Sequence, residues 1–147
     1  MIRIETLLGQ HDEALAMAQR LLALVDNLEA SRPIGPVVLQ FNHLFGLLRV
    51  HLAHENVGLY PELMASPDLQ VMRTAQRHLN ETADLAARLE CFALQWCNAA
   101  RIAGRIEEFR EEMNDLMLAL AVRFEQESRC LYPLAATVAA TPRRNAA

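Results

Sequence analysis

Four stretches of this chain carry apolar residues at spacings that alternate between three and four, and this pattern restricts the possible folds more than any other feature. Residues spaced in this way lie on one face of an α-helix. The pattern therefore predicts four amphipathic helices, at about residues 3–30, 37–64, 68–97 and 104–138. The four stripes are Ile4, Leu8, His11, Leu15, Ala18, Leu22 and Val25; Val37, Phe41, Leu44, Leu48, His51 and Glu55; Val71, Ala75, His78, Thr82, Leu85, Leu89, Phe92 and Trp96; and Phe109, Met113, Leu116, Leu120, Arg123, Glu127, Cys130 and Leu134.

The segments between the predicted helices carry strong helix-ending signals. The loop 31–36 contains two prolines and a glycine, and Ser66 followed by Pro67 is typical of an N-cap and a first helical turn. No stretch shows the alternation of a β-strand. We therefore expect an all-α fold, an antiparallel four-helix bundle with up-down-up-down topology. The chain is expected to form a single domain over 1–147, with residues 139–147 as a frayed tail.

Each stripe is interrupted by polar residues at one position along its length. About twenty residues separate His11 from the first loop, and about twenty more lead from that loop to His51 and Glu55. The same count over the remaining loops brings His78 and Glu127 to that height. The sequence thus predicts one polar level inside an otherwise apolar bundle, and a functional site at that level.

Composition and charge exclude several classes of function. Hydrophobic residues make up 52% of the chain, and its net charge of −4 is spread without a basic cluster, so nucleic acid is not an expected partner. The apolar runs are far short of the ~18 residues that a membrane span requires, and the N-terminus lacks the apolar core of a signal peptide. We therefore expect a soluble, cytoplasmic protein without a membrane partner.

The cysteines indicate the compartment, and the motifs that are missing indicate which activities to exclude. Three cysteines, an odd number without a CxxC pair, indicate a reducing compartment. Cys130 continues the fourth apolar stripe and is expected to be a small buried core residue. The sequence contains no nucleophile with a base, no phosphate-binding loop and no dinucleotide-binding pattern, so we expect no enzymatic activity.

The polar level contains side chains suited to a metal ion. His51 and Glu55 are four residues apart and point the same way on one helix, and His11 can complete a face of two histidines and one carboxylate. Glu127 adds a second carboxylate from another helix. This mixture of nitrogen and oxygen ligands suits iron, and it also fits manganese or zinc.

The chain also contains a weak internal repeat. Residues 55–61, Glu-Asn-Val-Gly-Leu-Tyr-Pro, parallel residues 127–133, Glu-Ser-Arg-Cys-Leu-Tyr-Pro. In addition, His11 and His78 occupy equivalent places on the preceding helices. The repeat predicts two helical hairpins related by approximate twofold symmetry, each contributing a histidine and a carboxylate.

These residues resemble the hemerythrin-like (HHE cation-binding) family over about residues 5–135. The resemblance rests on His11, on His51-Leu-Ala-His54-Glu55 with the following Leu59-Tyr60-Pro61, on His78, and on Glu127 with the following Leu131-Tyr132-Pro133. It implies a four-helix bundle with a non-heme iron site, often with two irons and bridging carboxylates, that binds or senses oxygen or a related small molecule. The metal ligands that it implies here are His11, His51, Glu55, His78 and Glu127.

The chain departs from this family pattern at two positions. Where the family has one further histidine in the third helix and another in the fourth, this chain has Thr82 and Arg123. The second metal position therefore retains only His78 and the shared carboxylates. Two like unit charges about 4 Å apart repel by roughly 4 kcal/mol at an effective dielectric near 20, so a second ion beside the first and beside Arg123 is disfavoured. We expect one ion, with Arg123 filling the second position and pairing with Glu127 or Glu55.

Several residues are expected beside the ligands rather than among them. Tyr60 and Tyr132 can donate hydrogen bonds near the site, although packing at the helix ends is the simpler interpretation. His43 and His54 flank their stripe and are expected at the surface or at an interface, with His54 as a reserve ligand. Glu81, close after His78, could substitute as a carboxylate ligand, but it lies off its stripe and is expected to face solvent.

A metal-free interpretation stays open. In it, Arg123 neutralises the buried carboxylates and the polar level is only structural. The run from Arg123 to Glu127, with the acidic patch at residues 107–112 before it, is weakly similar to the fourth helix of the regulator of sigma D family, whose members bind a sigma factor. On this interpretation the chain needs no cofactor and binds a protein partner through its outer helix faces; on the other, it binds a metal ion and a small diatomic ligand. A homodimer is compatible with both.

Overall fold

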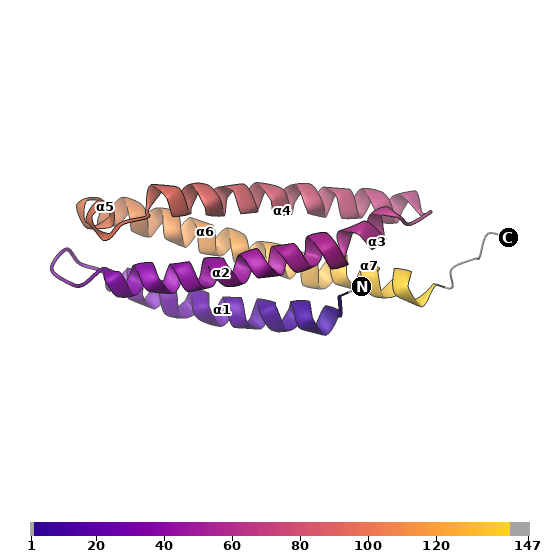
Figure 1. Cartoon of the computed structure of the whole chain (residues 1–147), viewed down its shortest axis with the longest axis horizontal. Helices are drawn as coiled ribbons and strands as arrows, with labels where there is room; N and C mark the ends of the chain where they lie inside the picture. Colours follow the sequence, from indigo (N-terminus) through magenta and orange to yellow (C-terminus); the bar gives the residue numbers. More distant parts are fainter. Residues whose placement is uncertain (1, 142–147) are drawn as a thin grey trace.

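The computed structural model describes residues 2–141, which are helical apart from short connections and contain no strand. Four long helices lie side by side along the long axis of the molecule (Figure 1). They are α1 (Ile4–Asp26), α2 (Gly35–Gly58), α4 (Leu69–Gln95) and α6 (Ile106–Gln126). The shorter segments are α3 (Tyr60–Met64), α5 (Ala99–Gly104), a π-helical turn η1 (Glu127–Leu131) and α7 (Tyr132–Ala140).

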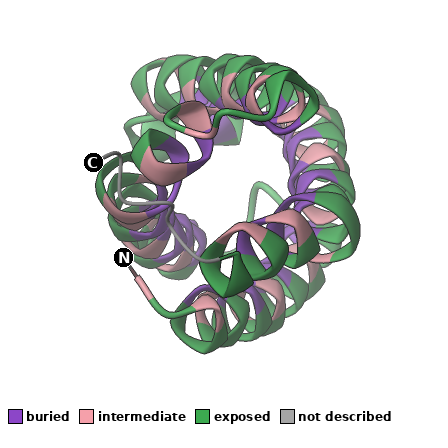
Figure 2. Cartoon of the chain, turned by 90° about the vertical axis from the view of Figure 1, so that its right-hand side faces the viewer, coloured by how far each residue is buried: buried purple, intermediate pink, exposed green. Residues whose placement is uncertain are grey.

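The connections between the long helices are divided between the two ends of the molecule. The loop between α1 and α2 lies at the same end as α5, whereas α3, α7 and the start of α1 lie toward the opposite end (Figure 1). Seen along the axis, the helices surround a common centre and turn their buried faces toward it (Figure 2). The all-α prediction is therefore confirmed, and the arrangement is compatible with a four-helix bundle. Within residues 2–141, no helix combines the length and apolar character needed to cross a membrane.

The helix ends follow local capping rules, with one difference from the prediction at α4. The Asp68 carboxylate accepts a hydrogen bond from the Gln70 amide at 2.9 Å, so Asp68 and not Ser66 caps this helix. Ser66 Oγ instead accepts from the Asp68 amide at 3.2 Å and orders the preceding turn. At α5, the Asn98 side chain accepts from the Arg101 amide in the same way. Caps of this kind contribute about 1 kcal/mol each.

Two of the predicted helices are interrupted near their C-terminal ends. The second breaks at Leu59, whose φ of −124° and ψ of −62° separate α2 from α3. The fourth widens into the π-helical turn η1 before it continues as α7. Each interruption comes shortly before a proline, Pro61 or Pro133, which lacks an amide hydrogen and whose ring crowds the preceding turn. The prediction of continuous helices over 37–64 and 104–138 is therefore wrong at these two points.

The π-helical turn changes which residues face the interior after Glu127. The hydrogen bonds of a π-helical turn join residues five apart instead of four, so the turn holds about one more residue than an α-helical turn, and the buried face moves along the chain by one position. Leu131 and Tyr132 are buried in consequence, and Cys130 is exposed. The prediction that Cys130 lies in the core is therefore wrong, because it assumed an uninterrupted α-helical period.

The C-terminal boundary also differs slightly from the prediction. The last helix, α7, extends to Ala140, so the first two residues of the expected frayed tail at 139–147 are helical. Residues 142–147 lie outside the described part of the chain.

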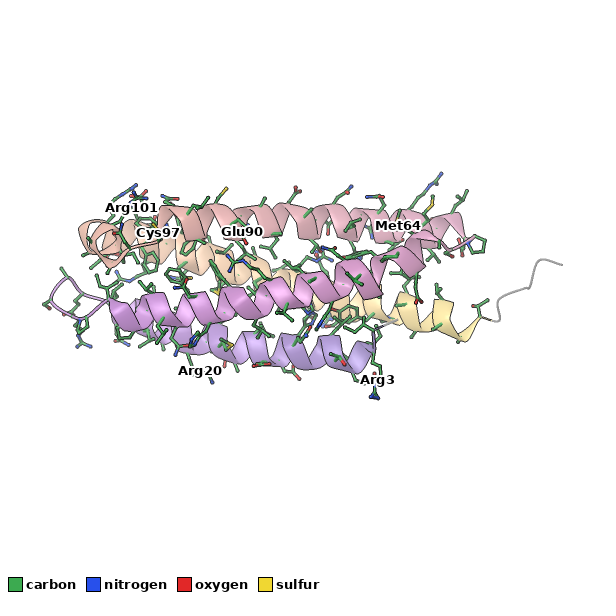
Figure 3. The ribbon with its side chains drawn as sticks, in the orientation of Figure 1. Arg3, Arg20, Met64, Glu90, Cys97 and Arg101 are labelled. Atoms are coloured by element: carbon green, nitrogen blue, oxygen red, sulfur yellow. The ribbon has the colours of Figure 1, made fainter. Side chains whose placement is uncertain are left out.

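Two apolar clusters fill the interior and leave a polar level between them. The larger cluster lies toward α5 and contains the side chains of Phe41, Phe92, Trp96 and Phe109. The smaller one lies toward α3 and α7 and contains Leu7, Leu59, Leu63 and Leu131. Charged side chains such as Arg3, Arg20 and Arg101 project from the outer surface instead (Figure 3).

Every long helix passes through the polar level in the same manner. On α1, for example, His11 lies between Leu7 of the smaller cluster and Ala14 of the larger one. The prediction of one polar height inside an apolar interior therefore describes the fold correctly. The buried polar residues at this height are His11, His51, Glu55, His78, Thr82, Arg123 and Glu127.

Candidate metal centre

Four of the buried polar residues form a compact group, which we call the His/Glu cluster: His11, His51, Glu55 and Glu127. One potential ligand atom from each of them lies within 4.8 Å of all the others. The cluster joins three elements, because His11 comes from α1, His51 and Glu55 from α2, and Glu127 from the first position of η1. The structure thus brings together side chains that are more than a hundred residues apart in the sequence.

The distances inside the cluster suit a metal ion. His11 Nε2 lies 2.8 Å from Glu127 Oε2, and His51 Nε2 lies 3.3 Å from Glu55 Oε1 and 3.7 Å from Glu127 Oε2. Ligand atoms that surround one ion at about 2.0–2.2 Å are roughly 3.0–3.5 Å from their neighbours. Small side-chain adjustments would therefore suffice to place these atoms around one ion.

Two polar atoms of the cluster have no hydrogen-bond partner in the described part of the protein. Among the described residues, His51 Nε2 and Glu55 Oε2 are buried and have no hydrogen-bond partner. Leaving such atoms unpaired in an apolar interior costs free energy, and buried charges are normally paired or coordinate a metal. This is the strongest indication that the residues present fit a bound cation.

The pKa values show how closely the cluster is coupled. Burial, the largest single effect, lowers the pKa of His51, but contacts with the Glu127 and Glu55 carboxylates together outweigh it and raise that pKa to about 9. Burial alone would raise the pKa of Glu127, whereas contacts with His11 and His51 hold it well below its usual range. Without a metal, a proton on His51 therefore supplies part of the positive charge that the carboxylates require.

Tyr132 belongs to the same site. Its hydroxyl donates a hydrogen bond to Glu55 Oε1 at 2.8 Å and lies 3.0 Å from His11 Nε2 and 3.4 Å from Glu127 Oε2. Burial and the nearby negative charges of Glu127 and Glu55 raise the pKa of this phenol, so it stays a donor. Tyr132 therefore donates a hydrogen bond in the site, as one interpretation expected, and its ring also packs in the smaller apolar cluster, as the simpler interpretation expected.

Three further residues, which the sequence pattern did not reveal, support the two histidines. Gln10 Oε1 accepts a hydrogen bond from His51 Nδ1 at 2.9 Å, and Ser128 Oγ lies 3.3 Å from His11 Nδ1. The Phe124 ring stacks on His11 with centroids 3.8 Å apart. Gln10 and Ser128 lie off the apolar stripes, so a search along the stripes misses them. Their only sequence signal is that each is adjacent to a member of the cluster.

His78, predicted as a metal ligand, is placed differently. Its Nδ1 accepts a hydrogen bond from the Arg123 guanidinium, and it is not part of the His/Glu cluster. Burial and the neighbouring Arg123 charge lower the pKa of His78, which favours the neutral ring. On the same side of the polar level, the Tyr60 hydroxyl and Thr82 Oγ1 are 3.3 Å apart. Tyr60 thus contacts Thr82 rather than a carboxylate.

Arg123 connects the two sides of the polar level. Its Nε lies 3.4 Å from Glu127 Oε1, one terminal nitrogen contacts His78, and the other forms an ion pair with Glu81. The expected pairing with Glu127 is therefore present. Glu81 is half-exposed, as expected for a residue beside its stripe. Its carboxylate nevertheless pairs with Arg123, so it does not contact solvent only. The Arg123 charge is thus offset by Glu81, and the charges of Glu55 and Glu127 remain for a divalent ion.

The remaining histidines lie outside the cluster. His43 is exposed on α2. His54 is half-buried, and its Nδ1 accepts a hydrogen bond from Gln10 Nε2 at 2.8 Å. This nitrogen of His54 is therefore already paired, and the structure does not place His54 among the residues of the cluster.

A comparison with known protein families agrees with this geometry. The family model described as Hemerythrin HHE cation binding domain matches residues 3–135, which include the whole His/Glu cluster. No curated protein and no solved structure matches the chain at a significant level.

Proposed function

We propose that this chain, which belongs to the hemerythrin HHE cation-binding domain family, holds a single divalent metal ion in its His/Glu cluster. The observation that carries the proposal is that four buried ligand atoms converge within 4.8 Å while His51 Nε2 and Glu55 Oε2 stay unpaired among the described residues. A cation would satisfy both atoms and offset the two carboxylates, whose burial is otherwise costly.

Iron is the ion that we assign to the site. Two imidazole nitrogens and two carboxylates suit Fe(II), and the family membership supports iron over manganese or zinc, which the same ligand types also accept. When bound, Fe(II) supplies an open coordination position for dioxygen or a related small molecule. The residues of this chain hold the ligands in place and exclude water: Phe124 covers the ring of His11, and Tyr132 orients Glu55. The proposed role is binding or sensing of that molecule rather than catalysis.

The number of ions follows from Arg123. Its guanidinium lies beside Glu127 Oε1 and against His78, which are the groups that a second ion would require. A second divalent ion there would meet a fixed positive charge as well as the first ion; two unit charges 4 Å apart already repel by roughly 4 kcal/mol at an effective dielectric near 20, and the double charge of the ions increases both repulsions. We therefore assign one ion per chain.

The topology of the helices and the cellular compartment are also part of what we propose. We infer an antiparallel up-down-up-down bundle that forms a single domain in the cytoplasm. Supporting it, α1 packs against α2 and α6, α4 packs against α6, and the connections lie at alternate ends (Figure 1). Free, exposed thiols at Cys91, Cys97 and Cys130 are compatible with a reducing compartment.

Metal analysis tests the proposal directly. Protein purified without metal and reconstituted with Fe(II) under anaerobic conditions should retain about one equivalent after desalting. Glu55→Gln removes a carboxylate of the cluster and should lower the affinity at least tenfold. Glu81→Gln makes the same chemical change on the Arg123 side of the polar level and should leave about one equivalent bound. Binding below roughly a fifth of an equivalent by the parent protein would overturn the proposal.

Thermal unfolding separates metal binding from the metal-free alternative. Because a ligand that binds only the folded state stabilises it by mass action, Fe(II) at a hundred times its dissociation constant should add about 2.7 kcal/mol. Melting curves that are identical with Fe(II) and with a chelator would instead favour a structural polar level and a regulatory role in binding a protein partner.

A further inference from the structure

We propose that Gln10 is a positioning residue for this site: its side-chain amide fixes the tautomer of His51 so that the Nε2 lone pair faces the His/Glu cluster. The inference rests on the proposed function and extends it to a residue outside the cluster. Gln10 lies on α1 directly before His11 and is half-buried.

The amide of Gln10 bridges two histidines on the neighbouring helix. Gln10 Oε1 is 2.9 Å from His51 Nδ1, and Gln10 Nε2 is 2.8 Å from His54 Nδ1. His51 and His54 are three residues apart, so they lie about one turn apart on the same side of α2. One glutamine thus contacts a histidine of the cluster at one end and a half-buried histidine at the other.

The chemistry of the amide decides where the His51 proton lies. An amide oxygen only accepts hydrogen bonds, so His51 Nδ1 must carry the hydrogen at this contact. A neutral imidazole has one N–H, which leaves a lone pair on Nε2. Nε2 is the atom that lies 3.3 Å from Glu55 and 3.7 Å from Glu127 and has no hydrogen-bond partner among the described residues. The contact with Gln10 therefore directs the lone pair of His51 into the cluster.

The other end of the amide keeps Gln10 in this orientation. Gln10 Nε2 can only donate, and His54 Nδ1 accepts from it. If the amide were reversed, its N–H group would face His51 Nδ1, and that nitrogen would have to accept. The hydrogen would then move to His51 Nε2 and occupy the ligand position. His54 thus acts on the site through Gln10 and not as a ligand.

A longer contact reaches the Nδ1 atom of the other histidine. Ser128 Oγ lies 3.3 Å from His11 Nδ1. Gln10 neighbours His11 in the chain and contacts His51, whereas Ser128 neighbours Glu127 and contacts His11. Outer partners that orient metal-binding histidines typically change metal affinity by about 10–100-fold. Because the Gln10 contact is shorter, Gln10→Leu should have a larger effect than Ser128→Ala.

The test compares two substitutions at Gln10. Gln10→Leu keeps much of the volume but removes the acceptor, and Gln10→Glu keeps an oxygen that can accept from His51 Nδ1. Competition with a chelator should show Zn(II) and Fe(II) binding weakened about 10–100-fold by Gln10→Leu and within a few-fold of the parent in Gln10→Glu. Gln40→Leu is the matched control, because Gln40 is also half-buried but lies eleven positions before His51 on α2, and it should leave the affinity unchanged.

A spectroscopic measurement reports the tautomer itself. In the Zn(II)-loaded parent protein, ¹⁵N NMR should show the Nδ1 hydrogen of His51 bonded and protected from solvent exchange. Gln10→Leu should accelerate that exchange, whereas Gln40→Leu should not. A purely structural role for Gln10 would lower the melting temperature without moving this signal.

The outcomes distinguish this inference from the proposed function. A parent protein that binds no ion would overturn both. Tight binding by the parent with unchanged affinity in Gln10→Leu, or a Zn(II)-loaded parent in which the single hydrogen of His51 lies on Nε2, would overturn the role of Gln10 alone. If Gln10→Leu does not fold, loss of binding in the folded Gln10→Glu variant would still contradict the inference.

Discussion

The two sides of the polar level both contain buried polar side chains, but they leave opposite kinds of polar atom unpaired. On the side of α1, α2 and η1, the unpaired atoms are His51 Nε2 and Glu55 Oε2. With Nδ1 donating to Gln10, both of these are acceptors once His51 is neutral, that is, once it has lost the proton that offsets the carboxylates in the metal-free protein. On the side of α4 and α6, the unpaired atoms are Arg123 Nε and His78 Nε2. His78 Nδ1 accepts from Arg123, so its Nε2 carries the hydrogen, and both atoms are donors.

This difference shows why similar repeats need not bind similar ions. A buried acceptor gains from a cation, whereas a buried donor next to a guanidinium repels one. The internal repeat in the sequence would suggest two equivalent metal positions. The structure instead contains one side prepared for a cation and one side that already holds a permanent cation in Arg123.

The largest expected effect comes from converting the second side into the first. The double substitution Thr82→His and Arg123→His removes the fixed charge and adds two imidazoles beside His78. We expect this variant to bind one more equivalent of Fe(II) than the parent, as measured by elemental analysis after anaerobic reconstitution. Arg123→His alone supplies the comparison and should gain less. If the double variant binds no more than the parent, Arg123 and Thr82 are not what separates the two sides.

Removing the Arg123 charge without replacement should destabilise the metal-free protein. Arg123→Met leaves the Glu127 carboxylate with fewer compensating contacts, and breaking a buried pair of this kind costs about 3–5 kcal/mol. Arg49→Met removes an arginine from an exposed ion pair with Glu90 and should cost less than about 1 kcal/mol. Urea unfolding in the presence of a chelator measures both. Equal losses for the two variants would mean that Arg123 is not needed to compensate the buried charge.

The pH dependence of stability should have opposite signs on the two sides. The folded-state pKa of His51 is raised to about 9, so its contribution is fully present below its ordinary pKa of 6.5 and is lost as the pH rises through 9. The pKa of His78 is lowered, so its contribution is present above 6.5 and is lost as the pH falls.

Unfolding free energies of the metal-free protein between pH 6 and pH 9 test this difference. His51 should account for a decrease of roughly 3 kcal/mol over that range, at about 1.4 kcal/mol per pKa unit. His51→Gln should remove the decrease, and the matched substitution His78→Gln should preserve it. A decrease that survives His51→Gln would assign the effect to another group.

The sequence predicts the height of the site well because that prediction needs only helix periodicity and loop positions. His11, His51, Glu55 and Glu127 each interrupt an apolar stripe, and their sequence distances from the loops are sufficient to bring them to one level. The predicted pairing of Arg123 with Glu127 follows from their spacing of four residues, which is one helical turn.

What the sequence could not predict depends on small changes in helix geometry and on residues beside the stripes. The π-helical turn holds one residue more than an α-helical turn, and no residue type in the sequence marks it. It exposes Cys130 and buries Tyr132. Gln10 and Ser128 act through side chains that reach sideways between helices, so no periodicity identifies them. Glu81 also lies off its stripe, so the pattern does not reveal that its carboxylate offsets the charge of Arg123.

The smallest expected effect compares the two tyrosines that the repeat makes equivalent. Both side chains are buried, but the Tyr132 hydroxyl donates to the Glu55 carboxylate at 2.8 Å, whereas the Tyr60 hydroxyl is 3.3 Å from the neutral Thr82 Oγ1. Tyr132→Phe leaves a buried charged acceptor without its donor and should cost about 1–3 kcal/mol in the metal-free protein. Tyr60→Phe removes a weaker neutral contact and should cost about 0.5–1 kcal/mol.

Saturating Fe(II) should reduce the cost of Tyr132→Phe, because Glu55 then has a cation as a partner, and should leave the cost of Tyr60→Phe unchanged. Chemical unfolding of both variants with and without Fe(II) measures this difference. Equal costs under both conditions would show that the two sides of the polar level are energetically alike despite their different partners.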